Sequence, residues 1–489
     1  MNFSLSLPAL LAIPMVGVLL IALGSRPKTT ALWVSVLNLI PGFLASGMVL
    51  RSGEILFGPE PIPVREVFPA KFILGMDGLS LSLVWLTLIV TLTAIGTGRE
   101  GIKREKEYYI CLLLIGLGAL GAFLSVDLFY FFSFHEVALI PTFLLVGMWG
   151  HGDRSGAAWR MTVYLMLGSM VLLVGMIGLF LALPEAARSL DWRVLSESLK
   201  ANPLSPGIQH VVAALLLVGF GTLVSLVPFH SWAPGGYASA PAPAAMLHAG
   251  VLKKFGLYGL LRVALPMVPD GWKEISWLVG LLLAGNILYL GLASLQQRDF
   301  RWLLGFSSAM HMGTVFLGLI SGTVLGLAGA LTLMVGHGLS AALGFAVAGE
   351  ISRRTGTSWM RDLGGLARRA PQLWFYLMIA AMASIGLPGL ANFAGEIMIF
   401  FGSWTAHPVL VGVAAWGVVL SAVATLRAVN AMAFGPMSPA VEAEGVTDLK
   451  GMRETWPFAV LTIALLLIGV MPLLVYGPAR PVLERLSQP

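Results

Sequence analysis

Charged residues are scarce in this chain, and cysteine is almost absent. Asp, Glu, Lys and Arg make up 11% of the 489 residues, against roughly 25% in soluble globular proteins. The one cysteine, Cys111, excludes an internal disulfide and a metal site built only from cysteines. No lysine or arginine precedes the first apolar run, and a cleaved signal peptide needs a basic start. We therefore expect that run to be retained as a membrane helix.

Long apolar runs are abundant, and they define the fold class. Hydrophobic residues make up 57% of the chain, and runs of about 20 residues, each long enough to span a bilayer, recur from end to end. The sequence predicts an all-α polytopic membrane protein with about fourteen transmembrane helices. The net charge of +6 is typical of basic membrane loops rather than of a nucleic-acid site. Lysine and arginine concentrate in alternate loops, which places both termini on the non-cytoplasmic side.

Two of the apolar runs are interrupted by proline and glycine. Pro228 lies in "TLVSLVPFHSWAPGGY" (222–237), and Pro388 lies in "MASIGLPGLANFAGEIMIF" (382–400). Matching broken helices in two halves indicate an inverted-repeat transporter with its site near the membrane midplane. We therefore predict two inverted five-helix repeats with broken helices 7 and 12. The predicted parts are N-terminal helices 1–3 (1–107), the first repeat (108–264), the second repeat (273–432), and helix 14 with the tail (456–489).

Ionisable residues inside the predicted spans are the candidate functional groups. A charged side chain at the bilayer centre costs about 2.5–3.5 kcal/mol on insertion scales, so such residues usually have a function. Acids, lysines and imidazoles spread over helices 5, 8, 10, 11 and 12 favour a proton relay over a rigid ligand pocket. The candidates for proton transfer are Glu136, His248, Lys254, His311, His337 and Glu396.

Each candidate also has a structural alternative. Lys253 and Lys254 could extend to the membrane surface, and the histidines could simply hydrogen-bond neighbouring helices, with Ser307 and Ser308 on the same face as His311. Asp127 and His230 are candidate access residues, although Asp127 also suits a helix cap. These alternatives stay open at the level of the sequence.

The motifs around these residues resemble those of a known family. The segments "FHEVALIPTFLLVGMWGH", "VPFHSWAP", "APAPAAMLHAGVLKKFGLYGLLR", "FSSAMHMG", "HGLSAALGF" and "GLPGLANFAGEIMIFFGSW" resemble the antiporter-like subunits of respiratory complex I (NADH-quinone oxidoreductase), most closely the M type. The resemblance covers about residues 70–430. It implies an energy-converting membrane, such as the bacterial inner membrane. It also implies no cofactor or metal in this chain, with NADH, FMN, iron–sulfur clusters and quinone in other subunits.

The resemblance also implies partners and residue roles. The partners would be L-type and N-type antiporter-like subunits, small membrane subunits and lipid, but not nucleic acid. Glu136 matches the family's fifth-helix glutamate, Lys254 the central eighth-helix lysine, and Glu396 the twelfth-helix glutamate of the M type. His311 and His337 match histidines of helices 10 and 11.

One position departs from the family pattern. The family pairs its fifth-helix glutamate with a seventh-helix lysine, and Leu223 occupies that position here. Lys253, an extra lysine on helix 8, is then the candidate charge partner of Glu136.

The predicted function is that of a proton-translocating membrane subunit driven by quinone reduction elsewhere in the complex. One alternative is a subunit of an Mrp-type Na⁺/H⁺ antiporter or of a membrane-bound hydrogenase. Another is a structural subunit that has lost or altered pumping because of Leu223.

Overall fold

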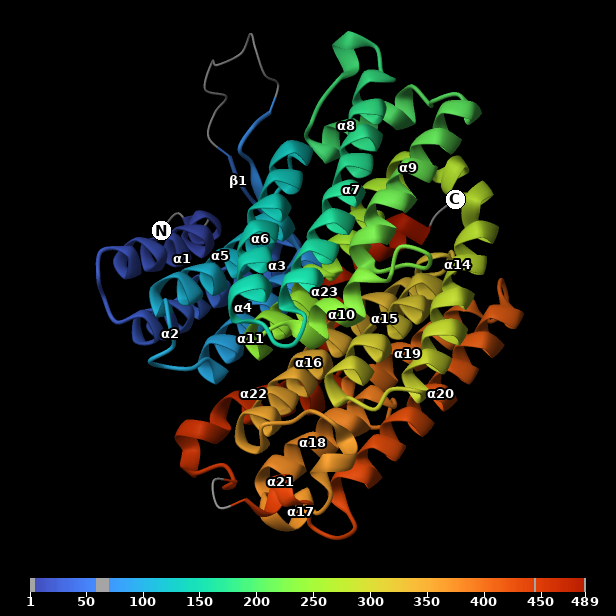
Figure 1. The fold of residues 1–489 in the computed structure, drawn as a ribbon. Helices are drawn as coiled ribbons and strands as arrows, with labels where there is room; N and C mark the ends of the chain where they lie inside the picture. Colours follow the sequence, from blue (N-terminus) through green and yellow to red (C-terminus); the bar gives the residue numbers. More distant parts are fainter. Residues whose placement is uncertain (1–4, 59–69, 444–445, 488–489) are drawn as a thin grey trace.

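The computed structural model describes residues 5–58, 70–443 and 446–487, and nearly all of them are helical (Figure 1). In this part of the chain, eleven helical segments are long and apolar enough to cross a membrane. They are α2 (Pro27–Leu37) with α3 (Leu39–Ser52), α4 (Gly78–Thr97), α5 (Glu105–Leu124), α6 (Leu128–Trp149), α7 (Arg154–Leu181), α9 (Pro206–Val224), α14 (Pro269–Leu295), α15 (Phe300–Leu319), α16 (Val324–Thr355), α20 (Pro408–Ala433) and α22 (Gly451–Val470). The first helix, α1 (Ser6–Ala22), is apolar but shorter.

Helix α16 forms the centre of the fold, between the N-terminal and C-terminal helices (Figure 1). Its most apolar window is completely buried, because small residues let neighbouring backbones approach closely. A Cβ atom on Gly338, for example, would lie 2.7 Å from the carbonyl oxygen of Gly250. The helix that carries His337 is thus surrounded by protein on every side.

The first proline-containing run is interrupted as its composition predicts. Helix α9 ends at Val224, and Pro228 lies in the non-helical segment 225–231 before α10 (Trp232–Ser239). Backbone groups in such a break need partners inside the protein. The Asn286 side chain of α14 supplies them, since it accepts from the Val227 amide at 2.6 Å and donates to the Ser225 carbonyl at 3.1 Å.

The eighth span is not the uniform helix that the sequence suggests. It consists of α11 (Ala242–Leu247), the π-helical turn η3 (His248–Leu252), α12 (Lys254–Gly259), a second π-helical turn η4 (Leu260–Ala264), and α13 (Leu265–Met267). π-Helical turns are rare and occur frequently at functional sites. Here they flank the two lysines, whose side chains are both fully buried.

The second interrupted run contains α18 (Pro371–Ser384) and α19 (Ala391–Ser403). Pro388 lies in the segment 385–390 between them, and Gly386 and Gly389 both have positive φ angles. Backbone amides of this segment donate to the Met382 and Ala383 carbonyls at the end of α18. The Ser384 carbonyl instead binds side chains from neighbouring helices.

Several elements lie outside the predicted spans. The prediction of an all-α chain misses a small antiparallel hairpin, because strand pairing between distant segments leaves no helical periodicity to read. The additional elements are β1 (Glu54–Phe57), β2 (Leu74–Asp77), η2 (Glu185–Ala187), α8 (Trp192–Ala201), η5 (Met360–Leu363), α17 (Leu366–Arg369), α21 (Pro439–Glu442) and α23 (Leu473–Ser487). Helix α23 packs against α4 and α16, so the chain beyond the last predicted span is part of the fold.

A buried ion pair connects the eighth span to the start of α4. The Arg262 guanidinium donates to the Asp77 carboxylate and lies 4.8 Å from the centroid of the Trp192 ring and 5.2 Å from that of Tyr258. Asp77 also caps α4 by accepting from two backbone amides. Both charges are thus satisfied by several partners, which offsets part of their burial cost.

We expect Arg262→Met to destabilise the protein by about 3–5 kcal/mol, because it leaves the Asp77 charge buried without its partner. Thermal unfolding of the purified protein measures the effect. Arg480→Met is the control, because it breaks the exposed Arg480–Glu484 pair, which should contribute less than about 1 kcal/mol. The double variant Arg262→Met/Asp77→Leu should recover part of the loss, and an unchanged melting temperature in Arg262→Met would contradict this account.

Candidate functional site

A row of polar side chains begins at Lys253, in the middle of the eighth span. The Lys253 ammonium donates to Ser308 Oγ at 3.2 Å, and Ser308 Oγ lies 3.0 Å from His337 Nε2. Lys253 also lies 4.9 Å from the centroid of the Tyr237 ring, where the electron-rich face stabilises a cation. The serine hydroxyl can both donate and accept, so it connects the lysine to the imidazole.

The row continues from His337 to the second helix break. The rings of His337 and His311 stack with centroids 5.5 Å apart, and His311 Nε2 lies 3.9 Å from Glu396 Oε1. His311 Nδ1 and Nε2 lie 2.7 Å from the Ser307 carbonyl and 2.8 Å from the Ser384 carbonyl. A carbonyl only accepts, so both hydrogen bonds form together only when both ring nitrogens carry protons.

Lys254 and His248 lie beside this row without joining it directly. The Lys254 ammonium donates to the Ala249 carbonyl at 3.1 Å, within its own span. His248 is 3% exposed, and neither of its ring nitrogens has a hydrogen-bond partner among the described residues. Its ring contacts those of Trp232 and Tyr237 at centroid distances of 5.4 and 5.6 Å. Neither lysine reaches the membrane surface, because both are fully buried.

Glu136 lies at the outer face of α6, apart from the lysines. Its side chain is 34% exposed, and its one ion-pair partner within the described residues is His135, with Nδ1 3.5 Å from Oε1. The expected pairing with Lys253 has no counterpart in these ion pairs, since the Lys253 ammonium binds Ser308 instead. Leu223 is buried and supplies no charge.

The two candidate access residues have different surroundings. Asp127 caps α6 by accepting from the Phe129 amide at 2.9 Å, and it also accepts from the Lys71 amide at 2.8 Å. This is the capping arrangement that the sequence left open. His230 is half-buried beside the exposed Pro228, and its ring meets that of Tyr289 edge-on.

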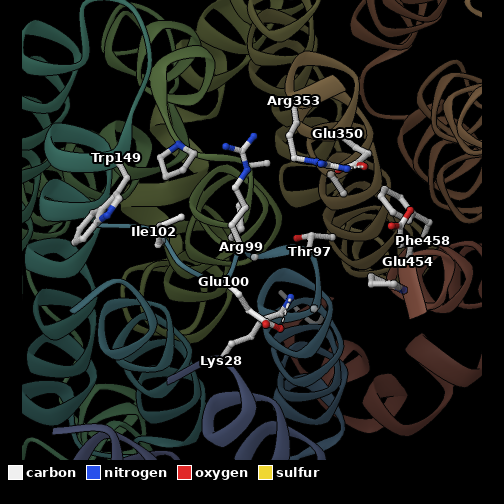
Figure 2. A pocket seen from close by; sticks show the side chains of 18 of the residues that line it. Lys28, Thr97, Arg99, Glu100, Ile102, Trp149, Glu350, Arg353, Glu454 and Phe458 are labelled. Carbon is white, nitrogen blue, oxygen red and sulfur yellow. Dashed lines mark hydrogen bonds and ion pairs between the residues drawn. The ribbon is translucent and has the colours of Figure 1, made fainter. Parts of the chain in front are cut away.

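A cavity of about 720 Å³ opens at the end of the bundle where the basic loops meet. Figure 2 shows Arg99 extending between the Lys28–Glu100 pair and the Arg353–Glu350 pair. Burial and the nearby Arg301 guanidinium lower the pKa of His151, which also lines the cavity. The cavity wall includes Pro241, Ala242 and Gly349, which belong to or adjoin the helices that carry His248 and His337.

Sequence reasoning missed several residues of the site. His135 stands directly before Glu136 in "FHE", so a second ionisable group at the same depth was visible in the sequence. Tyr237 and the Ser384 carbonyl had no such signal, because their roles depend on helices that meet only in the folded chain. Within the described residues, no group of three His, Cys, Asp or Glu side chains could hold a metal ion.

Sequence comparison finds known proteins that are similar to this chain. The family model "NADH:quinone oxidoreductase/Mrp antiporter, TM" matches residues 125–425. NADH-quinone oxidoreductase subunit M of Pseudomonas aeruginosa is 33% identical over 485 residues, covering 95% of this chain and 94% of that protein.

Comparison of structures leads to the same group. A chain of respiratory complex I from Thermus thermophilus superposes with a TM-score of 0.88 at 28% identity, covering 99% of both chains. A chain of the Mrp complex from a Dietzia species superposes with a TM-score of 0.85, covering 100% of this chain and 98% of that one. At 20% identity, this second likeness shows the fold alone.

Gly386→Ala should displace the Glu396 carboxylate. A Cβ at Gly386 would overlap Glu396 Oε2, and the φ of +72° adds about 1–2 kcal/mol of backbone strain for any other residue. Gly389→Ala is the matched control, because it has a similar φ of +92° and no atom within 4 Å.

Cryo-EM structures of both variants measure the separation of His311 Nε2 and Glu396 Oε1, which is 3.9 Å here. We expect it to change only in Gly386→Ala. An equal separation in the two variants would contradict the steric account.

Proposed function

The chain belongs to the family of M-type antiporter-like membrane subunits of NADH-quinone oxidoreductase (complex I), and on this premise we propose that protons cross it along its buried polar row. The observation that carries the proposal is the sequence of contacts from Lys253 through Ser308, His337 and His311 to Glu396. Neighbouring groups in the row can each donate or accept a proton. Protein also shields the row from lipid, in which uncompensated ionisable groups are costly.

Protons enter from the cavity at the basic end of the bundle and reach the row by way of His248, whose backbone carbonyl accepts from the Lys253 amide. Ala242, in the cavity wall, lies one to two helical turns from His248, or about 9 Å along the helix axis. The cationic side chains around the cavity make this the cytoplasmic end under the positive-inside rule, which leaves both termini on the other side.

Glu396 exchanges protons with the opposite side. It is 4% exposed and lies against Gly386, within the break between α18 and α19. Non-helical backbone at membrane depth is tolerated where it lines a wet cavity or is buried in protein. The break therefore suits the point at which the row meets water.

Glu136 connects the chain to its neighbours in the complex. Its side chain reaches the outer face of α6, where Val137 and Ile140 are exposed by 40% and 68%. A carboxyl group on an apolar face is costly in lipid, so this face meets another antiporter-like subunit, of the L or N type. Quinone reduction in other subunits, which also hold the NADH, FMN and iron–sulfur sites, drives proton movement through the row.

The predicted architecture fits the same proposal. The eleven long apolar segments become about fourteen spans when three more are added: α1, the eighth span (α11 to α13), and α18 with α19 counted as one. The breaks at 225–231 and 385–390 occupy corresponding places in the proposed repeats 108–264 and 273–432, with 1–107 and 456–489 outside them. An Mrp-type antiporter shares the fold, but the match at 33% identity is to subunit M of NADH-quinone oxidoreductase.

We expect Glu396→Asp to retain proton pumping better than Glu396→Gln, because only aspartate preserves a carboxyl group that can exchange protons. The measurement is the proton-to-electron ratio of the intact complex in liposomes. An unchanged proton-to-electron ratio in both variants would contradict the exit role of Glu396. It would favour the alternative in which this chain is a structural subunit and other subunits of the complex carry the protons.

Ser308→Ala should lower the same ratio, because it removes the hydroxyl between Lys253 and His337. Ser307→Ala is the matched control. His311 binds the Ser307 carbonyl at 2.7 Å, whereas the Ser307 hydroxyl lies 3.5 Å from the ring. Equal pumping in the two variants would show that the serine bridge is not part of the path.

A further inference from the structure

His135 is a buried ionisable group that the path described above does not use. It precedes Glu136 on α6, and adjacent helix positions point about 100° apart. The Glu136 side chain accordingly reaches the outer face with 34% exposure, while the His135 side chain turns inward with 3%. Nδ1 of His135 and Oε1 of Glu136 are both buried, lie 3.5 Å apart, and have no hydrogen-bond partner among the described residues. The imidazole thus stands between the carboxylate and the interior.

The His135 ring contacts the span that carries the two lysines. Its ring stacks on that of Phe255, with centroids 4.1 Å apart and an interplanar angle of 22°, and Phe255 directly follows Lys254. Helix α6 packs against η3, the π-helical turn that carries His248, and the two ring nitrogens of His248 have no hydrogen-bond partner in the described part of the chain. Buried polar atoms without partners are uncommon and call for a functional explanation. Here such atoms belong to α6 and to the π-helical turn that packs against it.

Leu223, the α9 residue that stands where the family has a lysine, lies in the same region. Phe131, Phe220 and Phe255 form an aromatic cluster between α6, α9 and α12. His135 lies one turn after Phe131, and Leu223 lies one turn after Phe220, so both border this cluster. Lys253, the other candidate partner, is held by Ser308 and the Tyr237 ring.

We propose that His135 is the proton-accepting partner of Glu136 and carries protons between Glu136 and His248. Nδ1 takes the proton that Glu136 Oε1 releases, and the other ring nitrogen gives up its own proton toward His248, so the imidazole remains neutral overall. When protons move the other way, the second ring nitrogen takes a proton from His248 and Nδ1 returns its proton to Glu136 Oε1. This inference rests on the proposed function, because it extends the buried row to the outer face of α6.

The test is His135→Phe in the intact complex in liposomes. Phenylalanine preserves the stack on Phe255 but removes both nitrogens. We expect the proton-to-electron ratio to fall as far as in Glu136→Gln, and the double variant to fall no further, because residues that act as one unit are not additive. His210→Phe is the matched control, since it removes the imidazole of a more exposed His–Glu pair, His210–Glu274, and should leave the ratio unchanged.

Leu223→Lys in the His135→Phe background should restore pumping, because a lysine reaches about 6 Å and an opposite charge within about 4–6 Å favours the ionised carboxylate. His135→Gln should assemble but lower the proton-to-electron ratio as far as His135→Phe does, since an amide can bind Glu136 but cannot carry its proton. Normal pumping in His135→Phe or His135→Gln would overturn the inference. If Glu136→Gln and Glu396→Gln also pumped normally, the proposed function itself would fail.

A structure of the wild-type complex provides a test that does not depend on assembly of a variant. We expect His135 Nδ1 within about 3.2 Å of the Glu136 carboxylate, or joined to it by one water, as proton transfer between them requires. A cation from another subunit bound to Glu136, with His135 turned away, would overturn the assignment.

Discussion

Lipid offers no hydrogen bonds, so every polar group placed at hydrocarbon depth must find its partner within the protein. The contact of Lys253 with Ser308 satisfies one of the two fully buried ammonium groups in this way. The same requirement accounts for the Asn286 side chain in the first break and for the Ser384 carbonyl that binds His311 in the second. The first break is thus satisfied by a neighbouring helix, and the second supplies a partner to the buried row.

The long central helix α16 makes this arrangement possible. Its small residues bring α11, α15 and α19 close enough for side chains from four helices to meet. His337 belongs to α16, while Ser308 and His311 belong to α15 and Glu396 to α19. Each contact in the row therefore crosses between helices, and loosening one helix would interrupt the row.

The two buried or half-buried acids of the proposed proton path, Glu136 and Glu396, have different surroundings. Glu396 is enclosed by protein and lies against a glycine with a positive φ. Glu136 reaches the outer face and has one imidazole beside it. An enclosed acid can be positioned by its own chain, whereas an acid at the surface also depends on what covers that surface. The functional unit is thus larger than this chain, as membership in a multisubunit complex requires.

Composition and motif order by themselves determined the membrane class, the family and most of the buried ionisable residues, because long apolar runs leave few other folds and intramembrane charges are rare. The proline and glycine pattern also located both helix breaks. Only the tertiary structure decided which groups are partners. Lys253 binds Ser308 rather than Glu136, and His135 takes the place beside that acid. Helical periodicity assigns a side chain to one face of its helix. Which neighbouring helix covers that face, and where π-helical turns change its direction, depend on packing between segments far apart in the chain.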